Sequence, residues 1–240
     1  MSYLYLFRHG QAGTRDSYDR LSTVGRRQAD LLGLYLAGEK VHFETAYVGG
    51  MTRQRETAEA VAAAYRESGV AFPELTPAPS WNEFDLDHVY GEIAPQIAAA
   101  DPLFRSAYQE LIEQVRLSAG SETAEVNRRW SPCDIQVVDA WIRSLYPYSG
   151  ESWDQFRARV CSPRASMNGD ESNIAIFTSA TPAAIWTGLA LDIHDTRVLH
   201  LAGALYNTSI TVLRLKQKQL NLFSFNGAPH LTDAALRTHR

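Results

Sequence analysis

The chain has 240 residues, 45% of them hydrophobic, which is enough apolar material for the core of one large domain. Its net charge of −4 at pH 7 excludes a general electrostatic attraction to nucleic acid or to an acidic membrane. The two cysteines, Cys133 and Cys161, lack metal-ligand spacing, so we interpret them as reduced thiols of a cytoplasmic protein. The apolar runs are too short to predict a secretory signal or a membrane span.

Residues 3–7 (YLYLF) form an apolar run that predicts a short strand buried on both faces, as in a parallel sheet. Arg8, His9 and Gly10 follow at its carboxyl end, where open α/β sheets place their ligand crevices. A guanidinium binds phosphate oxygens, a neutral imidazole can act as a nucleophile, and glycine lets the backbone approach a ligand. The tripeptide suits phosphoryl chemistry, although alone it would favour an ordinary loop histidine after a strand.

Strands and helices then alternate, which predicts an α/β fold with a parallel sheet. In the first third of the chain we expect helices at about 22–36 and 52–68, and strands at 41–48 and 71–75. Residues 84–150 differ, because they carry helical patterns at 103–117 and 137–145 and no strand signal. We interpret them as a helical insertion over the mouth of the sheet.

The last third resumes the alternation. A core helix is expected at 152–167 and a central strand at 174–178, with a helix beginning near Pro182. Strands at 209–215 and 219–225 are joined by a predicted turn at residues 216–218.

Further segments agree with one known family, in the order in which the family carries them. They are Arg8-His9-Gly10, residues 21–29 (LSTVGRRQA), 51–58 (MTRQRETA), 81–85 (WNEFD), 150–152 (GES, followed by Phe156 and Arg159), 207–211 (NTSIT) and 229–231 (PHL). The chain therefore resembles the histidine phosphatase superfamily, also called phosphoglycerate mutase-like, over residues 3–231. The resemblance implies an α/β three-layer sandwich whose mostly parallel central sheet is flanked by helices. It also implies a single domain of residues 1–240, with the helical insertion at about 84–150.

The resemblance assigns roles to four residues. His9 is the expected nucleophile, Arg8 and Arg53 are expected to hold the phosphoryl oxygens, and Glu83 is expected to protonate the leaving alkoxide. Alternatives are Arg55, as an additional phosphate contact, and Asp85 or Asp87, either of which could be mistaken for the acid.

One segment departs from the family pattern. Ser179 stands where the family carries its second histidine, and Ala180 stands in place of the following glycine. A serine donates a hydrogen bond without the charge of an imidazolium, which predicts a loss of about a hundred- to a thousandfold in rate. We expect Thr178, Ser179 and Ala180, together with Arg15 in the first loop, to contribute to substrate binding.

The sequence thus predicts a metal-independent phosphomonoesterase that acts on a small phosphorylated substrate through a phosphohistidine. The alternative is a degenerate member that binds a phosphorylated ligand or a protein partner with little turnover. A mutase is disfavoured, because Arg15 replaces the asparagine that mutases of the family carry and no R-H-Y-G follows Glu83. We expect no cofactor, no metal, and neither nucleic acid nor membrane as partner, and a homodimer stays open.

Two sets of side chains in the remaining sequence are ambiguous. Four aromatic residues of the insertion could wall a pocket for an apolar leaving group, but such residues at helical spacing more often form core. They are Trp130, Trp141, Tyr146 and Tyr148. His194, His200 and His230 are expected to be structural or exposed rather than catalytic.

Overall fold

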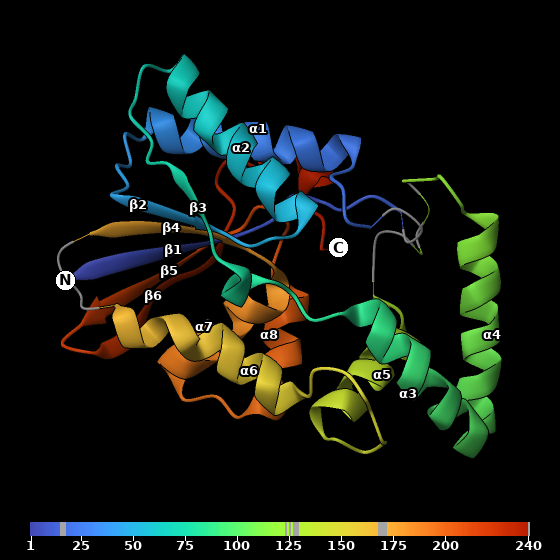
Figure 1. The fold of residues 1–240 in the computed structure, drawn as a ribbon. Coiled ribbons are helices and arrows are strands. Elements are labelled where there is room, and N and C mark those ends of the chain that lie inside the picture. Colours follow the sequence, from blue (N-terminus) through green and yellow to red (C-terminus); the bar gives the residue numbers. More distant parts are fainter. Residues whose placement is uncertain (15–17, 123, 125, 127–129, 168–171, 240) are drawn as a thin grey trace.

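The computed structural model describes residues 1–14, 18–122, 124, 126, 130–167 and 172–239. Their centre is a six-stranded sheet in the order β3-β2-β4-β1-β5-β6. Helices α1 and α2 cover one face of the sheet, and α6, α7 and α8 cover the other (Figure 1). The predicted α/β sandwich of three layers is confirmed.

The bounds of the elements are as follows. The strands are β1 (Ser2–Arg8), β2 (Thr45–Val48), β3 (Leu75–Pro77), β4 (Asn173–Thr178), β5 (Ile210–Lys216) and β6 (Gln219–Gly227). The helices are α1 (Thr23–Gly38), α2 (Thr52–Glu67), α3 (Leu86–Ala100), α4 (Pro102–Leu117), α5 (Pro132–Ile142), α6 (Trp153–Cys161), α7 (Ala180–Leu191) and α8 (Val198–Ala204).

The pairing of the strands brings the ends of β1 and β4 together. Strands β1 to β4 run parallel, whereas β5 is antiparallel to its neighbours β1 and β6. In the register of β1 and β4, Arg8 lies opposite Thr178, and the amide of His9 donates to the Thr178 carbonyl at 2.9 Å. The tripeptide after β1 and the segment after β4 therefore meet at one edge of the sheet.

Alternate residues of the central strands build two cores. Phe7 and Phe177 point to the side of α1 and α2, where their rings stack with centroids 5.1 Å apart. Leu6 and Ile176 point to the opposite side, where they join the core beneath α6 and α7. Because both faces are buried, these strands read as continuous apolar runs rather than as alternating ones.

Strands β2 and β3 differ from their predicted bounds. Strand β2 begins at Thr45 rather than at residue 41, and β3 is Leu75–Pro77 rather than 71–75. Phe72 lies within the predicted strand 71–75, but it precedes β3. Its ring packs against that of Tyr65, with the ring centroids 4.8 Å apart. A proline is tolerated in β3 because this strand lies at the edge of the sheet.

Two helix boundaries were also wrong. Helix α5 starts at Pro132 rather than at 137, because Ser131 and Asp134 form a capping box and proline is favoured at the first helical position. Helix α6 ends at Cys161 rather than at 167, since Pro163 follows in a 3₁₀ turn. Helices α3 and α8 were not predicted individually. Pro95 inside α3 interrupts the pattern that would have indicated it.

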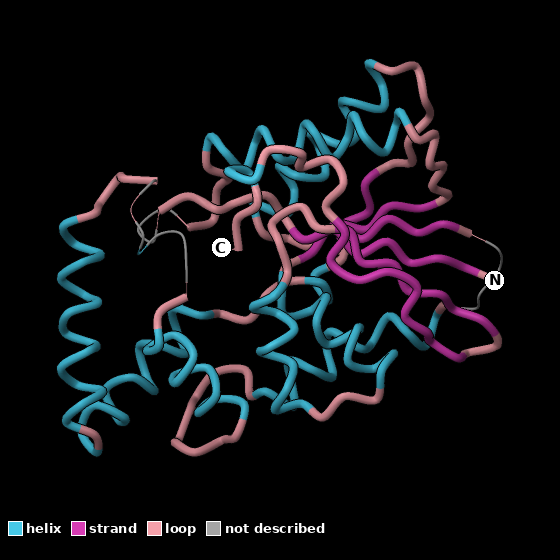
Figure 2. Tube along the Cα trace, turned by 180° about the vertical axis from the view of Figure 1, so that it is seen from behind, coloured by secondary structure: helices cyan, strands magenta, loops and turns pink. Residues whose placement is uncertain are grey.

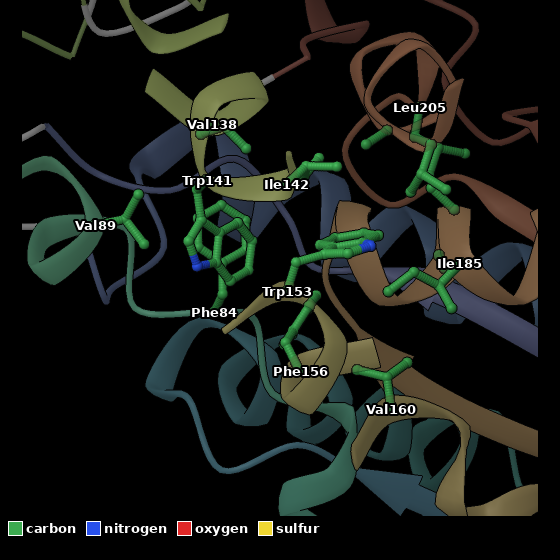
Figure 3. Close-up of a cluster of buried hydrophobic side chains, with 14 of the residues drawn as sticks. Phe84, Val89, Val138, Trp141, Ile142, Trp153, Phe156, Val160, Ile185 and Leu205 are labelled. Carbon is green, nitrogen blue, oxygen red and sulfur yellow. The ribbon is translucent and has the colours of Figure 1, made fainter. Parts of the chain in front are cut away.

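Residues 84–150, which were predicted as an insertion and are called the insertion below, contain α3, α4 and α5, which lie beside the carboxyl ends of the parallel strands (Figures 1 and 2). It is joined to the main body by a buried aromatic cluster, which Figure 3 shows. There the Phe84 ring lies 4.6 Å from that of Trp141, and Trp141 contacts Trp153 edge-on. The insertion therefore shares one hydrophobic core with α6 and α7.

No helix within the described residues is long and apolar enough to cross a membrane.

Candidate active site

A cavity of about 810 Å³ opens at the carboxyl ends of β1 and β4. The structure brings four predicted residues from three separate segments to its lining: Arg8, His9, Arg53 and Glu83. Helices α3 and α4 contribute the opposite wall. We call the part formed by the four predicted residues the floor of the cavity, and the part formed by the insertion its wall.

His9 is held as a neutral imidazole with one ring nitrogen available to act as a nucleophile. Its Nδ1 lies 2.7 Å from the carbonyl oxygen of Gly10, which can only accept, so Nδ1 carries the proton. Burial, together with the nearby guanidinium groups of Arg53 and Arg8, holds the pKa of His9 well below its usual value. The Nε2 atom therefore keeps a lone pair at neutral pH.

Arg53 lies beside this lone pair. It is in the first turn of α2, where its Nε donates to Nε2 of His9 at 3.1 Å. Its Nη1 donates to Asp19 at 3.0 Å, and its guanidinium lies 4.7 Å from the ring centre of Tyr18. These contacts hold the guanidinium at the floor. By contrast, the exposed Arg55 bonds Gly50 and Thr52 of its own segment and does not line the cavity.

Arg8 is oriented by backbone carbonyls. The last strand position places it at the edge of the floor, and only 3% of the residue is exposed. Its guanidinium donates to the carbonyl of Leu205 and, at 2.8 Å, to that of His239. The C-terminal segment thus helps to build the floor, as Figure 1 shows by the place of the C-terminus beside the ends of the strands.

Glu83 contributes to the floor a carboxyl group whose pKa is raised. Burial raises its pKa, although the backbone amide of Thr181 donates to Oε2 at 3.1 Å. The amide of Phe84 donates to Oε1 at 3.3 Å. Because Thr181 lies in the first turn of α7, the start of that helix fixes the position of the acid.

Close backbone contacts hold the loop after β1 in place. A Cβ atom at Gly10 would lie 2.4 Å from the carbonyl oxygen of Gly25, and one at Gly25 would lie 2.1 Å from that of Gln11. The Gly10 amide donates to Thr57 at 3.0 Å, and the Thr57 hydroxyl donates to the Arg53 carbonyl at 2.7 Å. These contacts tie the His9 loop to α1 and to the helix that carries Arg53.

Residues 178–180, at the end of β4, were predicted to contribute to substrate binding, but most of them do not line the cavity. Thr178 donates its hydroxyl to the Trp81 carbonyl at 2.7 Å, and fully buried Ser179 accepts from Nε2 of Gln54 at 2.8 Å. Neither residue lines the cavity, whereas Ala180 does. Arg15 lies outside the described residues.

Several of these partners were missed by the sequence analysis. Tyr18, Asp19 and Gln54 contact Arg53 or Ser179. Gln54 could have been noticed, because it directly follows Arg53, the arginine that is predicted to bind phosphate. Asp19 sits in a polar loop without any distinguishing pattern.

Two other histidines lie away from the floor. His230 is buried, which lowers its pKa to about 4, and its Nε2 lies 2.9 Å from the Thr208 hydroxyl. The amide of Thr208 in turn donates to the carbonyl of His9 at 3.2 Å, so His230 supports the loop. His194 is exposed and caps a short 3₁₀ turn. Within the described part of the chain, no group of three or more His, Cys, Asp or Glu side chains is arranged to hold a metal ion.

Comparison with known proteins agrees with this arrangement. A family model for the "Histidine phosphatase superfamily (branch 1)" matches residues 4–140. The mitochondrial serine/threonine-protein phosphatase Pgam5 of Caenorhabditis briggsae is 24% identical over 170 residues, which cover 66% of this chain. The match spans only 56% of the length of that relative.

Solved structures share the fold at low sequence identity. YhfR of Bacillus stearothermophilus matches with a TM-score of 0.63 and 18% identity, covering 96% of this chain and 100% of that one. Phosphoglycerate mutase from Bacillus anthracis str. Sterne matches with a TM-score of 0.60 and 17% identity, covering 96% and 95%.

Proposed function

This chain belongs to the histidine phosphatase superfamily, and on that basis we propose that it is a metal-independent phosphomonoesterase acting through a phosphohistidine at His9. One observation carries the proposal. The neutral imidazole of His9 presents its Nε2 lone pair to a cavity that also contains two arginines and a carboxyl group with a raised pKa.

In the first step Nε2 of His9 attacks the phosphorus atom, and the bond from phosphorus to the ester oxygen breaks. Arg53 releases its hydrogen bond to Nε2 and, with Arg8, binds the phosphoryl oxygens, whose charge it stabilises. Glu83 transfers its proton to the leaving oxygen, so the product is a neutral alcohol. A raised pKa suits Glu83 to this role, because the carboxyl group must hold a proton before the reaction.

In the second step water attacks the phosphohistidine. The carboxylate of Glu83 takes a proton from this water, the bond from nitrogen to phosphorus breaks, and inorganic phosphate leaves. Both His9 and Glu83 return to their starting protonation states. The proposed mechanism uses fixed arginine charges where other phosphatases use metal ions.

A second function is favoured by a specific observation. Where the family pattern places another histidine, Ser179 is buried and bonded to Gln54, so it brings no charge to the cavity. A floor that lacks one charged donor binds phosphoryl groups and turns them over slowly. The alternative is therefore a degenerate member that binds a phosphorylated ligand or a protein partner.

A panel of phosphate esters, assayed with and without EDTA, distinguishes the two functions. We expect the wild type to release phosphate from at least one ester, unchanged by EDTA, and His9→Ala to release none. His200→Ala, which removes an exposed imidazole outside the cavity lining, is the matched control. Equal rates for wild type and His9→Ala would favour the binding function, and loss of activity in EDTA would contradict the mechanism.

A further inference from the structure

The wall of the cavity is apolar where the floor is charged. Helix α4 presents Tyr108, Leu111 and Val115 to the cavity at a spacing of three and four residues, which places them on one side of the helix. Ile112 lies next to them and also lines the cavity. Trp130, ahead of α5, adds an indole ring to this wall.

Part of this wall is not buried by the protein's own core. Leu111 is 7% exposed, but Ile112 is 51% exposed, on the cavity side of a helix that lies at the edge of the molecule (Figure 2). Covering such apolar surface with a ligand removes it from water, which favours binding. By contrast, Trp141 from the same insertion is 2% exposed and contributes only to the core.

A neighbouring tyrosine is also turned to present its ring. Tyr90 of α3 lines the cavity, and its hydroxyl donates to Asp134 of α5 at 2.5 Å. Its ring lies 6.0 Å from that of Tyr108. The two rings extend the apolar wall from α4 to α3.

Charge limits what else a ligand could carry. Asp85 and Asp87 line the cavity at the start of α3, between the floor and the wall. Among the described lining residues, the cations are Arg8 and Arg53 of the floor and Arg20 of the loop before α1, and none comes from α3 or α4. A second anionic group on a ligand would therefore lie near carboxylates and be repelled.

The volume supports a ligand larger than phosphate. Small-molecule sites occupy about 300–1,000 Å³ and are mostly apolar with a few polar groups. The 810 Å³ of this cavity falls in that range, and one phosphoryl group at the floor leaves the wall uncovered.

We propose that the wall is a binding site for an uncharged apolar leaving group, so that the substrate class is the phosphate monoester of an alkyl or aryl alcohol. The inference rests on the proposed function for the hydrolysis step. The binding site itself does not depend on turnover and can be tested separately.

Two alkyl esters that differ in the length of the leaving group, and a third ester with a charged one, provide the test. We expect the wild type to hydrolyse hexyl phosphate with a kcat/KM about tenfold or more above that for ethyl phosphate, because four more methylenes leave water. 3-Phosphoglycerate, which carries a carboxylate, should be a poorer substrate than either. Similar kcat/KM values for all three esters would overturn the inference.

Matched variants of α4 locate the site. Ile112→Asp should remove most of the preference for hexyl phosphate over ethyl phosphate. Leu103→Asp is the control: Leu103 is 83% exposed on the same helix, outside the cavity lining and nine positions away, which is half a turn around the axis. Val115→Ser is a second variant of the wall. An equal effect of Ile112→Asp and Leu103→Asp would contradict the placement.

Binding of phosphonates separates this inference from the proposed function. Hexylphosphonate, which cannot be hydrolysed, should bind the wild type more tightly than ethylphosphonate by calorimetry, and Ile112→Asp should abolish the difference. If no ester is hydrolysed but hexylphosphonate keeps its advantage, the proposed function fails and the apolar site stands. If the two phosphonates bind equally, or neither binds, the apolar site is wrong.

Discussion

The floor and the wall of the cavity are built in different ways. At the floor, His9 and Arg53 are 2% and 3% exposed, and hydrogen bonds from distant segments fix their positions. On the wall, Tyr108 and Ile112 belong to the same helix, α4. The apolar residue Ile112 is 51% exposed, far more than His9 and Arg53 of the floor. Under the proposed function, the floor would set the chemistry and the wall would set which leaving group is accepted.

The difference also bears on how each region tolerates change. A polar group that is removed from the floor leaves its buried partners unpaired, which costs more than the lost bond. An apolar group that is removed from the exposed part of the wall, such as Ile112, costs mainly the ligand contact. Substitutions at the floor should therefore lower kcat for every ester, whereas those on the wall should change the preference among esters.

After the complete loss expected for His9→Ala, the largest effect is expected at Arg53. Arg53→Ala should lower kcat about a hundred- to a thousandfold for all esters, because a charged donor to the phosphoryl oxygens is lost. Arg55→Ala, two positions along α2, should stay within about twofold, since that side chain bonds only its own segment. Steady-state kinetics of the two variants decides between them. Equal losses would mean that both arginines belong to the floor.

A smaller effect is expected at the acid, with a characteristic pH dependence. Because burial raises the pKa of Glu83, the wild-type rate should fall as the pH rises through this raised value. Glu83→Gln should lower kcat by about tenfold to a hundredfold with alkyl esters and remove this limb of the pH profile. A Glu83→Gln profile that retains the limb would assign it to another group.

The raised pKa of Glu83 also predicts how the stability of the fold depends on pH. A raised pKa means that the folded state prefers the protonated carboxyl group, a preference that stabilises the fold below pH 4.5 and is lost as the pH rises through the folded value. Glu83→Gln should therefore have an equal or higher Tm than the wild type at pH 7. Asp87→Asn, an exposed carboxylate on the same cavity, is the control.

The smallest effect on rate is expected at Ser179, which we interpret as standing in the place of the family's second histidine. Gln54 contacts Ser179 and fills the space beside it, so Ser179→His alone should not raise turnover and should cost about 1–3 kcal/mol through overpacking. Ser179→His combined with Gln54→Ala has room for the imidazole and should raise kcat, with Gln54→Ala as control. Higher turnover in the single variant at unchanged Tm would show that Gln54 does not occupy this space.

The sequence predicted the floor better than it predicted the wall. His9, Arg53 and Glu83 each lie within a short motif, and β1 places its motif at the end of a strand by the local apolar pattern alone. The partners of these residues could not be predicted, because Asp19 and His239 reach the floor from loops whose paths depend on tertiary contacts.

The wall shows the same limit more clearly. The sequence analysis left Trp130 and Trp141 open between cavity wall and core, and packing against Phe84 and Trp153 makes Trp141 part of the core. Helix α3, which lines the cavity, was not predicted individually within the helical insertion, since Pro95 interrupts its pattern. A periodic pattern indicates which residues share a face, but not which neighbour that face meets.

The central claim is that His9 accepts the phosphoryl group, and trapping the intermediate tests it most directly. The wild type would be mixed with hexyl phosphate, quenched within milliseconds in alkali, where phosphohistidine survives, and digested for mass spectrometry. The account predicts a phosphoryl group on the peptide that contains His9, present in Glu83→Gln and absent from His9→Ala. Hydrolysis of the ester without phosphorylation of His9 at any quench time would contradict it.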